Sequence, residues 1–439
     1  MRKLYFCARD IRDYFKGIMN TDKFDKTPDF DPNFPALIDA PAIQDFLFDL
    51  MKIYEHREAA CEAPICGETD IEGLRLDFNF GLRLDVPEGN FHVTIGDSNG
   101  QIFFDRDISD VRLISVEKYF IRWRVEVYRD SEKIFEHDFN PEGQSVLMIF
   151  MINAPLGDTL ALLPAIKAFK QNFNCAVSIY LPEYLREIAA NLYPDLSQVA
   201  EINFDNYATY YCLMYGGDFP FCTVDYRNEP LELMGGAILN LNTFPPKPTF
   251  KPTLPKLFKE PYVCIGVQAS TPTKGWLYPD GWKIIVDYLK SLGYRVFCID
   301  KEKFQSNGKY SAAAPDNAED FTGDFSIMER ANMLYHAEFF IGLSSGLAWV
   351  AEVVNCPIIM IAGFTHDWHE FYTPYRVANR LVCNGCYSDI RVRAFNDFCP
   401  YQKNTARELE CQKKISPRQV LNAIERLILD KNLTPPALK

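Results

Sequence analysis

The feature that most constrains this fold is a series of short, continuously apolar segments that alternate with segments of helical spacing. The first apolar segment, VLMIFMI, starts at Val146 and contains no charged or amide side chain. A strand without a polar face must be covered on both sides, as a parallel strand between two layers of helices is. Strands that alternate with helices predict βαβ units. The chain is therefore expected to be of the α/β class.

A proline-rich stretch divides this alternating region into two units. Residues 244–256 hold five prolines in 13 positions, which predicts a stiff connector. We expect one doubly wound domain over 146–250 and a second over 257–380. Ligands of such sheets bind at the carboxyl ends of the strands, so two units in series predict a cleft between them.

The residues before this region follow a different pattern. Apolar and polar residues alternate over 91–95, which is the period of a half-buried strand. An Asn-Gly dipeptide soon afterwards predicts a hairpin turn. We expect a small, all-β, barrel-like module over 78–145. Residues 1–77 form an extension to which we assign no role, although 42–56 has the spacing of a helix.

Composition and charge exclude several function classes. The 439 residues include 46 Lys and Arg against 59 Asp and Glu, a formal net charge of -13. A negative field repels phosphate backbones, so we expect no nucleic-acid partner. No stretch reaches the roughly 20 apolar residues that span a bilayer. The N-terminus has charges where a signal peptide has its apolar core. We therefore predict a cytoplasmic protein without an integral membrane segment.

The tetrapeptide Leu156-Gly157-Asp158-Thr159 follows the first apolar strand, in a loop before a helix expected from about Thr159. Two interpretations of Asp158 are open. It caps the helix N-terminus, as Asp commonly does, or its carboxylate faces the cleft and acts as a general base. Position alone favours the cap.

Two further loops at strand ends have the chemistry of an anion site. Ser344 to Leu347 (SSGL) lies between a strand and a helix, where backbone amides and hydroxyls suit phosphate oxygens. An N-cap followed by a flexible glycine is the alternative. Lys274 can reach a diphosphate as a point charge, although most lysines are solvated surface residues. The P-loop and GxGxxG patterns are absent, which argues against a P-loop NTPase and a nicotinamide dehydrogenase.

Four cysteines near the C-terminus have the spacing of a metal site. They follow the pattern C-x2-C-x12-C-x11-C within 29 residues: Cys383, Cys386, Cys399 and Cys411. Four thiolates predict a closed tetrahedral site, for which zinc is the general expectation and iron is an alternative. We expect this metal segment and a closing helix to occupy 381–432. His366 and His369 lack a clear third ligand and are not expected to bind a metal. The nine scattered cysteines are expected to be free thiols.

Several motifs together are similar to those of a known enzyme family. The chain resembles the bacterial autotransporter heptosyltransferases, which belong to the ADP-heptose glycosyltransferases of the GT-B fold. The resemblance covers residues 78 to 430, and the cysteine knuckle separates this family from the lipopolysaccharide heptosyltransferases. It rests on VPEG (86–89), LGD (156–158), YGGD (215–218), YVCI (262–265), GYRVFCID (293–300), EDFTG (319–323), FFIGLSSGLAW (339–349), EFYTP (370–374), CNGC (383–386) and CPYQKNTARELEC (399–411).

The resemblance implies a fold, a reaction and an assembly. It implies two Rossmann-like domains that face a cleft, the first on the acceptor side and the second on the nucleotide-sugar side. It implies transfer of heptose from ADP-heptose to serine hydroxyls of an autotransporter passenger protein. It also implies one structural iron per subunit, held by the four cysteines, with zinc as the alternative metal. The implied assembly is a homo-oligomer, for which the family's known size is twelve subunits.

The resemblance also implies roles for single residues. Asp158 becomes the catalytic base and Lys274 the diphosphate contact. The other residues implied to bind substrate are Gly157, Thr159, Gln268, Ser270, Thr322, Gly323, Ser344, Ser345, Gly346 and Leu347.

Two alternative functions stay open from the sequence. One is a lipopolysaccharide-type heptosyltransferase, although the acidic charge suits an anionic membrane poorly. The other is a non-enzymatic, iron-binding assembly or electron-transfer protein, although the cysteine cluster occupies a small part of a two-lobed chain.

Overall fold

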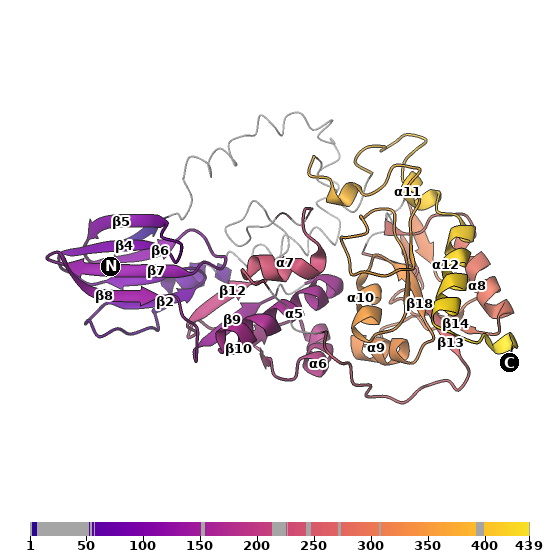
Figure 1. Cartoon of the computed structure of the whole chain (residues 1–439), viewed down its shortest axis with the longest axis horizontal. Coiled ribbons are helices and arrows are strands. Elements are labelled where there is room, and N and C mark those ends of the chain that lie inside the picture. The colour runs from indigo at the N-terminus through magenta and orange to yellow at the C-terminus, as the bar shows by residue number, and fades with distance from the viewer. Residues whose placement is uncertain are drawn as a thin grey trace.

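The computed structural model describes the chain from the N-terminal strand to the closing helix, with gaps. The described residues are 2–6, 52, 55–56, 58–150, 154–212, 225, 227–242, 247–270, 274–306, 309–391 and 399–438. Figure 1 shows an elongated molecule, with the N-terminal strands at one end, a first α/β lobe in the middle and a second α/β lobe at the other end. Most of the helix expected over 42–56, and the YGGD segment, lie outside the described residues.

Four strands of the predicted β module pair antiparallel with their neighbours, whereas the N-terminal strand β1 pairs in parallel with β6. A four-stranded sheet has the order β5-β4-β7-β8. Val93 lies opposite Val127, and Ile95 opposite Val125, so their side chains face one buried layer. The predicted hairpin is confirmed, since β4 pairs with β5 across a turn in which Gly100 has a φ of 85°. The bounds are β4 (Phe91–Asp97), β5 (Ile102–Ile108), β7 (Trp123–Arg129) and β8 (Glu132–Asp138).

The second sheet joins the N-terminal strands to the first α/β lobe. Its order is β1-β6-β3-β2-β12-β9-β10-β11, and β12 pairs in parallel with both β2 and β9. The predicted boundary between residues 145 and 146 therefore falls within a sheet that the β module and the first lobe share. The other predicted domain limits stay predictions. The bounds are β1 (Arg2–Phe6), β2 (Arg75–Asn79), β3 (Arg83–Val86), β6 (Val111–Ser115), β9 (Ser145–Ile149), β10 (Ala176–Tyr180), β11 (Ser197–Val199) and β12 (Ala208–Tyr211).

Helices pack against the sheet of the first lobe. The long helix α5 contacts α7, and its buried side includes Leu160, Leu163 and Ile166. The bounds are α5 (Leu156–Phe173), α6 (Glu183–Leu192) and α7 (Leu231–Ile238). The apolar run at β9 is buried on both faces, which confirms the prediction of a covered parallel strand.

The second lobe is a parallel sheet with helices packed against it. Its order is β17-β14-β13-β18-β19-β20, so the strand order reverses beside β13, where doubly wound sheets bind ligands. The strands are β13 (Tyr262–Ile265), β14 (Arg295–Cys298), β17 (Glu319–Asp320), β18 (Phe340–Leu343), β19 (Ile358–Ile361) and β20 (Arg376–Val377). The helices are α8 (Gly281–Ser291), α9 (Ile327–Tyr335), α10 (Gly346–Val353), α11 (Glu410–Lys413) and α12 (Pro417–Asp430).

Three small elements complete the second lobe. A two-stranded hairpin is formed by β15 (Phe304–Ser306) and β16 (Ser311–Ala313). Short 3-10 helices lie at η2 (Cys386–Ser388) and η3 (Pro436–Leu438). Among the helices of the described residues, none is both long and apolar enough to cross a membrane.

Candidate active site

Asp158 lies inside the first turn of a helix. The sequence predicts a loop up to Asp158 and a helix from about Thr159, but α5 starts at Leu156. Pro155 occupies the N-cap position, and its carbonyl accepts hydrogen bonds from the backbone N–H and the hydroxyl of Thr159, both at 3.0 Å. Proline fits here because its fixed φ of -62° precedes the helix without requiring an N–H donor. The first turn is also where the helix dipole favours a carboxylate.

Two glycines bring the first turns of helices from different lobes together. A Cβ atom on Gly157 would lie 2.5 Å from the Trp349 ring, and one on Gly346 would lie 2.9 Å from the Leu156 side chain. A larger residue at either position would force a side chain or the helices themselves to shift. The LGD and SSGL segments, predicted separately from the sequence, therefore meet at one junction (Figure 1).

Lys274 faces the same junction from the loop after β13. Burial lowers the pKa of its ammonium group, and the negative charges of Asp158 and Glu370 act in the opposite direction. These interactions require that both carboxylates are near the lysine. Asp158 comes from the first lobe and Lys274 from the second, so the structure brings the predicted base and the predicted diphosphate contact together.

Glu370 is a residue of this site that our sequence reasoning did not assign. Its buried carboxylate accepts hydrogen bonds from the hydroxyls of Ser344 and of Thr365, the latter at 2.7 Å, and pairs with Arg376 at 2.8 Å. Burial acts to raise the pKa of Glu370, but Arg376 and the hydrogen bonds hold the pKa below its ordinary value. Glu370 is thus an ionised group at the ends of β18 and β19. The EFYTP motif contained the signal, without indicating the partners.

A second group lies at the ends of β13 and β14, where the predicted Gln268 and Gly323 contact Asp300 and Arg330, two residues that the sequence did not assign to the site. The buried carboxylate of Asp300 accepts hydrogen bonds from the backbone N–H groups of Val267, at 2.7 Å, and Gln268, at 3.2 Å. Burial raises the pKa of Asp300 to about 6. Arg330 donates to the carbonyls of Asp300 and Gly323, at 3.0 and 2.9 Å, which ties these loops together.

The remaining predicted residues lie near these groups or at their edge. The Thr322 hydroxyl donates to Asp320 at 2.6 Å, whereas Ser270 has an exposed side chain. Two buried polar atoms in the described part of the chain have no hydrogen-bond partner and lie beside the junction, namely Ser345 Oγ and His369 Nδ1. Buried polar atoms are rarely left unpaired in proteins. They are therefore suitable contacts for a polar ligand.

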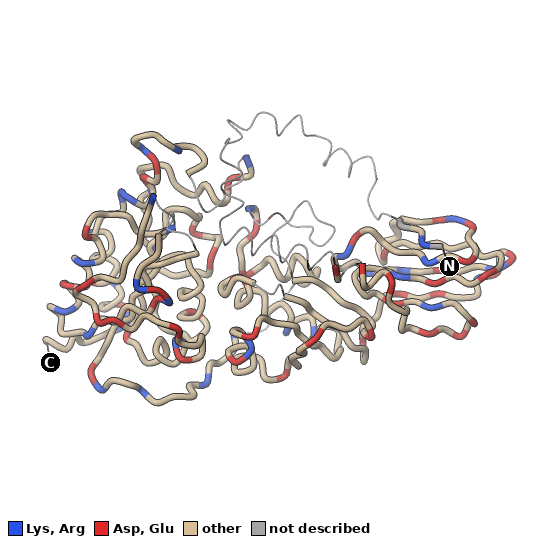
Figure 2. Tube along the Cα trace, turned by 180° about the vertical axis from the view of Figure 1, so that it is seen from behind, with Lys and Arg blue, Asp and Glu red and all other residues tan. Residues whose placement is uncertain are grey.

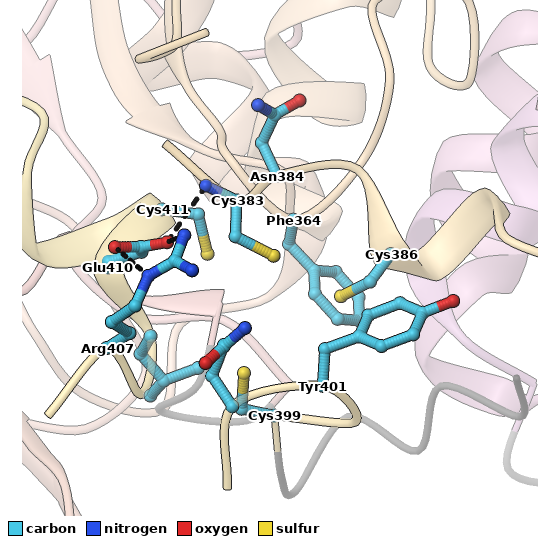
Figure 3. Close-up of a pocket in the computed structure, with 11 residues that line it drawn as sticks. Phe364, Cys383, Asn384, Cys386, Cys399, Tyr401, Arg407, Glu410 and Cys411 are labelled. Atoms are coloured by element: carbon cyan, nitrogen blue, oxygen red, sulfur yellow. Dashed lines mark hydrogen bonds and ion pairs between the residues drawn. The ribbon is translucent and has the colours of Figure 1, made fainter. Parts of the chain in front are cut away.

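The four predicted cysteines line one small cavity. Cys386, Cys399 and Cys411 are buried and Cys383 is half-buried. The cavity has a volume of about 10 Å³, and Figure 3 shows the four sulfur atoms around a common space. Burial raises the pKa of the Cys386 thiol, and the other three cysteines raise it further. Across the described residues, however, no three such side chains are close enough to form a metal-binding group as they stand.

The other cysteines agree with the interpretation as free thiols where they are described. Cys61, Cys175, Cys212, Cys264, Cys298 and Cys356 are buried, Cys66 is exposed, and none of these seven forms a disulfide.

Two α/β lobes with a charged junction at their strand ends suit a glycosyltransferase, and comparison with known families shows that class. Residues 240–401 match the model of glycosyltransferase family 9 (heptosyltransferase). Residues 71–131 match that of the glycosyltransferase TibC N-terminal domain.

Known relatives identify the family more closely. The chain is 37% identical over 366 residues to the autotransporter heptosyltransferase BAHTCr of Citrobacter rodentium, covering 81% of this chain and 89% of the relative. It is 35% identical over 372 residues to TibC of Escherichia coli, covering 81% and 90%. It is also 30% identical over 370 residues to the inactive autotransporter heptosyltransferase BimC of Burkholderia thailandensis, covering 81% and 86%. This chain belongs to the autotransporter heptosyltransferase family, which confirms the resemblance.

A solved structure agrees with the fold. Dodecameric, iron-containing TibC in complex with ADP-D-beta-D-heptose matches with a TM-score of 0.78 and 34% identity, covering 84% of this chain and 99% of TibC. The mixed α/β, GT-B type architecture predicted from the sequence is confirmed at this level.

Proposed function

We propose that this glycosyltransferase moves heptose from ADP-heptose to serine hydroxyls of an autotransporter passenger protein in the cytoplasm. The names of its relatives and the ADP-heptose complex of TibC support the donor and the acceptor class. The single observation that carries the proposal is the junction of α5 and α10, where Asp158 of one lobe and Lys274 of the other interact.

The reaction needs a base for the acceptor and compensation for the leaving group. A serine hydroxyl is a weak nucleophile, and Asp158 takes its proton as the hydroxyl oxygen attacks the anomeric carbon. The bond from that carbon to the diphosphate then breaks, and negative charge grows on the departing ADP. Lys274 and the backbone amides of Ser345 and Gly346, at the start of α10, offset this charge.

The other predicted substrate residues surround this centre. Gly157 and Thr159 shape the start of α5, and Leu347 belongs to the first turn of α10. Gln268, Ser270, Thr322 and Gly323 lie in loops that follow strands of the nucleotide-sugar lobe, where the nucleoside half of the donor would bind.

The cysteine cavity fits a metal by its donor chemistry. Four sulfur donors around a cavity of about 10 Å³ suit a single tetrahedral ion. We propose one iron per subunit, as in the iron-containing TibC structure, with zinc as the substitute. All four positions would be protein ligands, so the metal would supply structural order. The same relative supports a homo-oligomer, with twelve subunits as its size.

The test of the base is Asp158→Asn with ADP-heptose and a passenger protein. We expect turnover to fall by about 10²–10⁴, the usual weight of a general base, while ADP affinity persists. Glu183→Gln is the matched control, because Glu183 is an exposed carboxylate in the first turn of α6. Near-normal turnover of Asp158→Asn would show that Asp158 is not the base and only stabilises the start of α5.

The test of the diphosphate contact is Lys274→Ala. We expect weaker ADP binding together with slower turnover, because the diphosphate is charged in both the ground and the transition state. Lys283→Ala, at an exposed lysine of α8, is the control. Since BimC is an inactive relative, turnover of the wild-type chain is measured alongside.

A further inference from the structure

The segment that holds the four cysteines, within residues 381–432, contacts the loop that carries Lys274. A role in metal binding alone does not explain this contact. The Nζ atom of Lys274 lies 5.9 Å from the centre of the Tyr387 ring and 6.0 Å from that of Phe364. Tyr387 directly follows the cysteine Cys386. Phe364 lines the cavity of the four cysteines. One side of the Lys274 ammonium group therefore faces two rings, Tyr387 of the cysteine segment and Phe364 of the loop after β19. We call this pair of rings the aromatic wall.

The same loop is also bonded to the far end of the segment. The indole N–H of Trp276 donates to the carbonyl of Ile415 at 2.8 Å, and the backbone N–H of Leu277 donates to the carbonyl of Gln412 at 3.2 Å. Trp276 is buried, so this anchor is protected from water. Lys274 thus lies in a loop that the cysteine segment holds from two directions.

The aromatic wall has little freedom to move. The backbone N–H of Tyr387 donates to the carbonyl of Phe364 at 3.2 Å, and that of Gly385 donates to Gly363 at 2.9 Å. The two rings contact each other, with centres 5.1 Å apart. A Cβ atom on Gly363 would lie 2.5 Å from the carbonyl oxygen of Cys411, so the loop after β19 and the segment approach as closely as backbones allow.

We propose that Tyr387 is a positioning residue for the diphosphate of a nucleoside diphosphate sugar, acting by holding the Lys274 ammonium group against its ring. An ammonium within about 6 Å of an aromatic ring is attracted to its electron-rich face. The cysteine segment is then a part of the donor site as well as a folding element. This inference rests on the proposed role of Lys274.

The test compares Tyr387→Phe with Tyr387→Leu in the full-length chain. Phenylalanine keeps the ring, so we expect ADP affinity close to that of the wild type. Leucine keeps apolar bulk but removes the ring, and we expect the ADP dissociation constant to rise by about threefold to thirtyfold. Tyr372→Leu is the matched control, because Tyr372 is 81% exposed. Calorimetry measures ADP binding, and mass spectrometry measures the iron and zinc content of each variant.

A double variant shows whether Tyr387 acts through the lysine. If it does, Tyr387→Leu combined with Lys274→Ala binds ADP no more weakly than Lys274→Ala alone. Additive losses, or full ADP affinity in Tyr387→Leu, would overturn the inference. So would a loss that simply follows a lower metal content. Unchanged ADP binding in Lys274→Ala alone would instead overturn the proposed role of the lysine.

Discussion

At the scale of single residues, some charged residues of the site could be predicted from the sequence, but the residues with which charged groups pair could not. Asp158 and Lys274 stand next to apolar strands, and that position indicates a strand-end site. Glu370 was missed because its partners are set by tertiary structure. Ser344 is 26 positions away and belongs to another strand end. Spacing along one sequence contains no information on such a pairing.

The buried imidazole of His369 predicts a dependence of stability on pH. Burial lowers the pKa of His369 to about 4 in the folded protein, from 6.5. The unfolded chain therefore binds a proton at a pH where the folded chain does not, so the free energy of unfolding falls as the pH drops below 6.5. Between pH 7 and pH 5, this group alone should remove about 2 kcal/mol.

The variant His369→Phe isolates this contribution. Phenylalanine keeps a ring against Tyr387, whose centre lies 4.8 Å away, but cannot be protonated. We expect the urea midpoint of this variant to fall less than that of the wild type between the two pH values. Parallel losses in the two proteins would show that His369 does not titrate as a buried neutral ring.

At the scale of elements, local patterns were sufficient to predict the covered strand β9 and the hairpin of β4 and β5. The end of α8 shows such a local signal, since the helix is followed by Gly293 at a φ of 87°, a conformation that glycine adopts readily at helix ends. The start of α5 was placed about three residues late, because a proline at the N-cap position was not considered. The pairing of β2 with β12 was also not predicted, since it joins residues 130 positions apart.

The cysteine segment makes a prediction at this scale. Replacing Cys399 with Ser should lower the metal content and the stability of the second lobe, because an irregular segment of about 30 residues loses its cross-link. Cys175→Ser is the matched control, since Cys175 is a similarly buried thiol in the first lobe. It should leave the metal content unchanged. A full metal content in Cys399→Ser would remove this cysteine from the ligand set.

At the scale of the whole molecule, the order of the lobes could be predicted, but their closeness could not. The proline-rich stretch indicated two units, whereas the approach of α5 to α10 depends on glycines in separate motifs. In Figure 2, basic and acidic residues are interspersed along the described trace of both lobes. Binding of an anionic donor therefore depends on local groups at the junction rather than on a field of one sign.

Nucleotide choice is the corresponding prediction. If the junction binds ADP-heptose, ADP should raise the melting temperature by much more than UDP or GDP does at equal concentration. Lys274→Ala should lose most of the ADP shift. Equal shifts for the three nucleotides would contradict the donor assignment.

The most direct measurement of the central claim is the intact mass of an autotransporter passenger co-expressed with this chain. The proposed function predicts a series of masses that increase in steps of one heptose residue, located on serines by fragmentation. Co-expression with Asp158→Asn should return the unmodified mass, and Glu183→Gln should reproduce the wild-type series. An unmodified passenger with the wild-type chain, or an equal series with Asp158→Asn, would contradict the account.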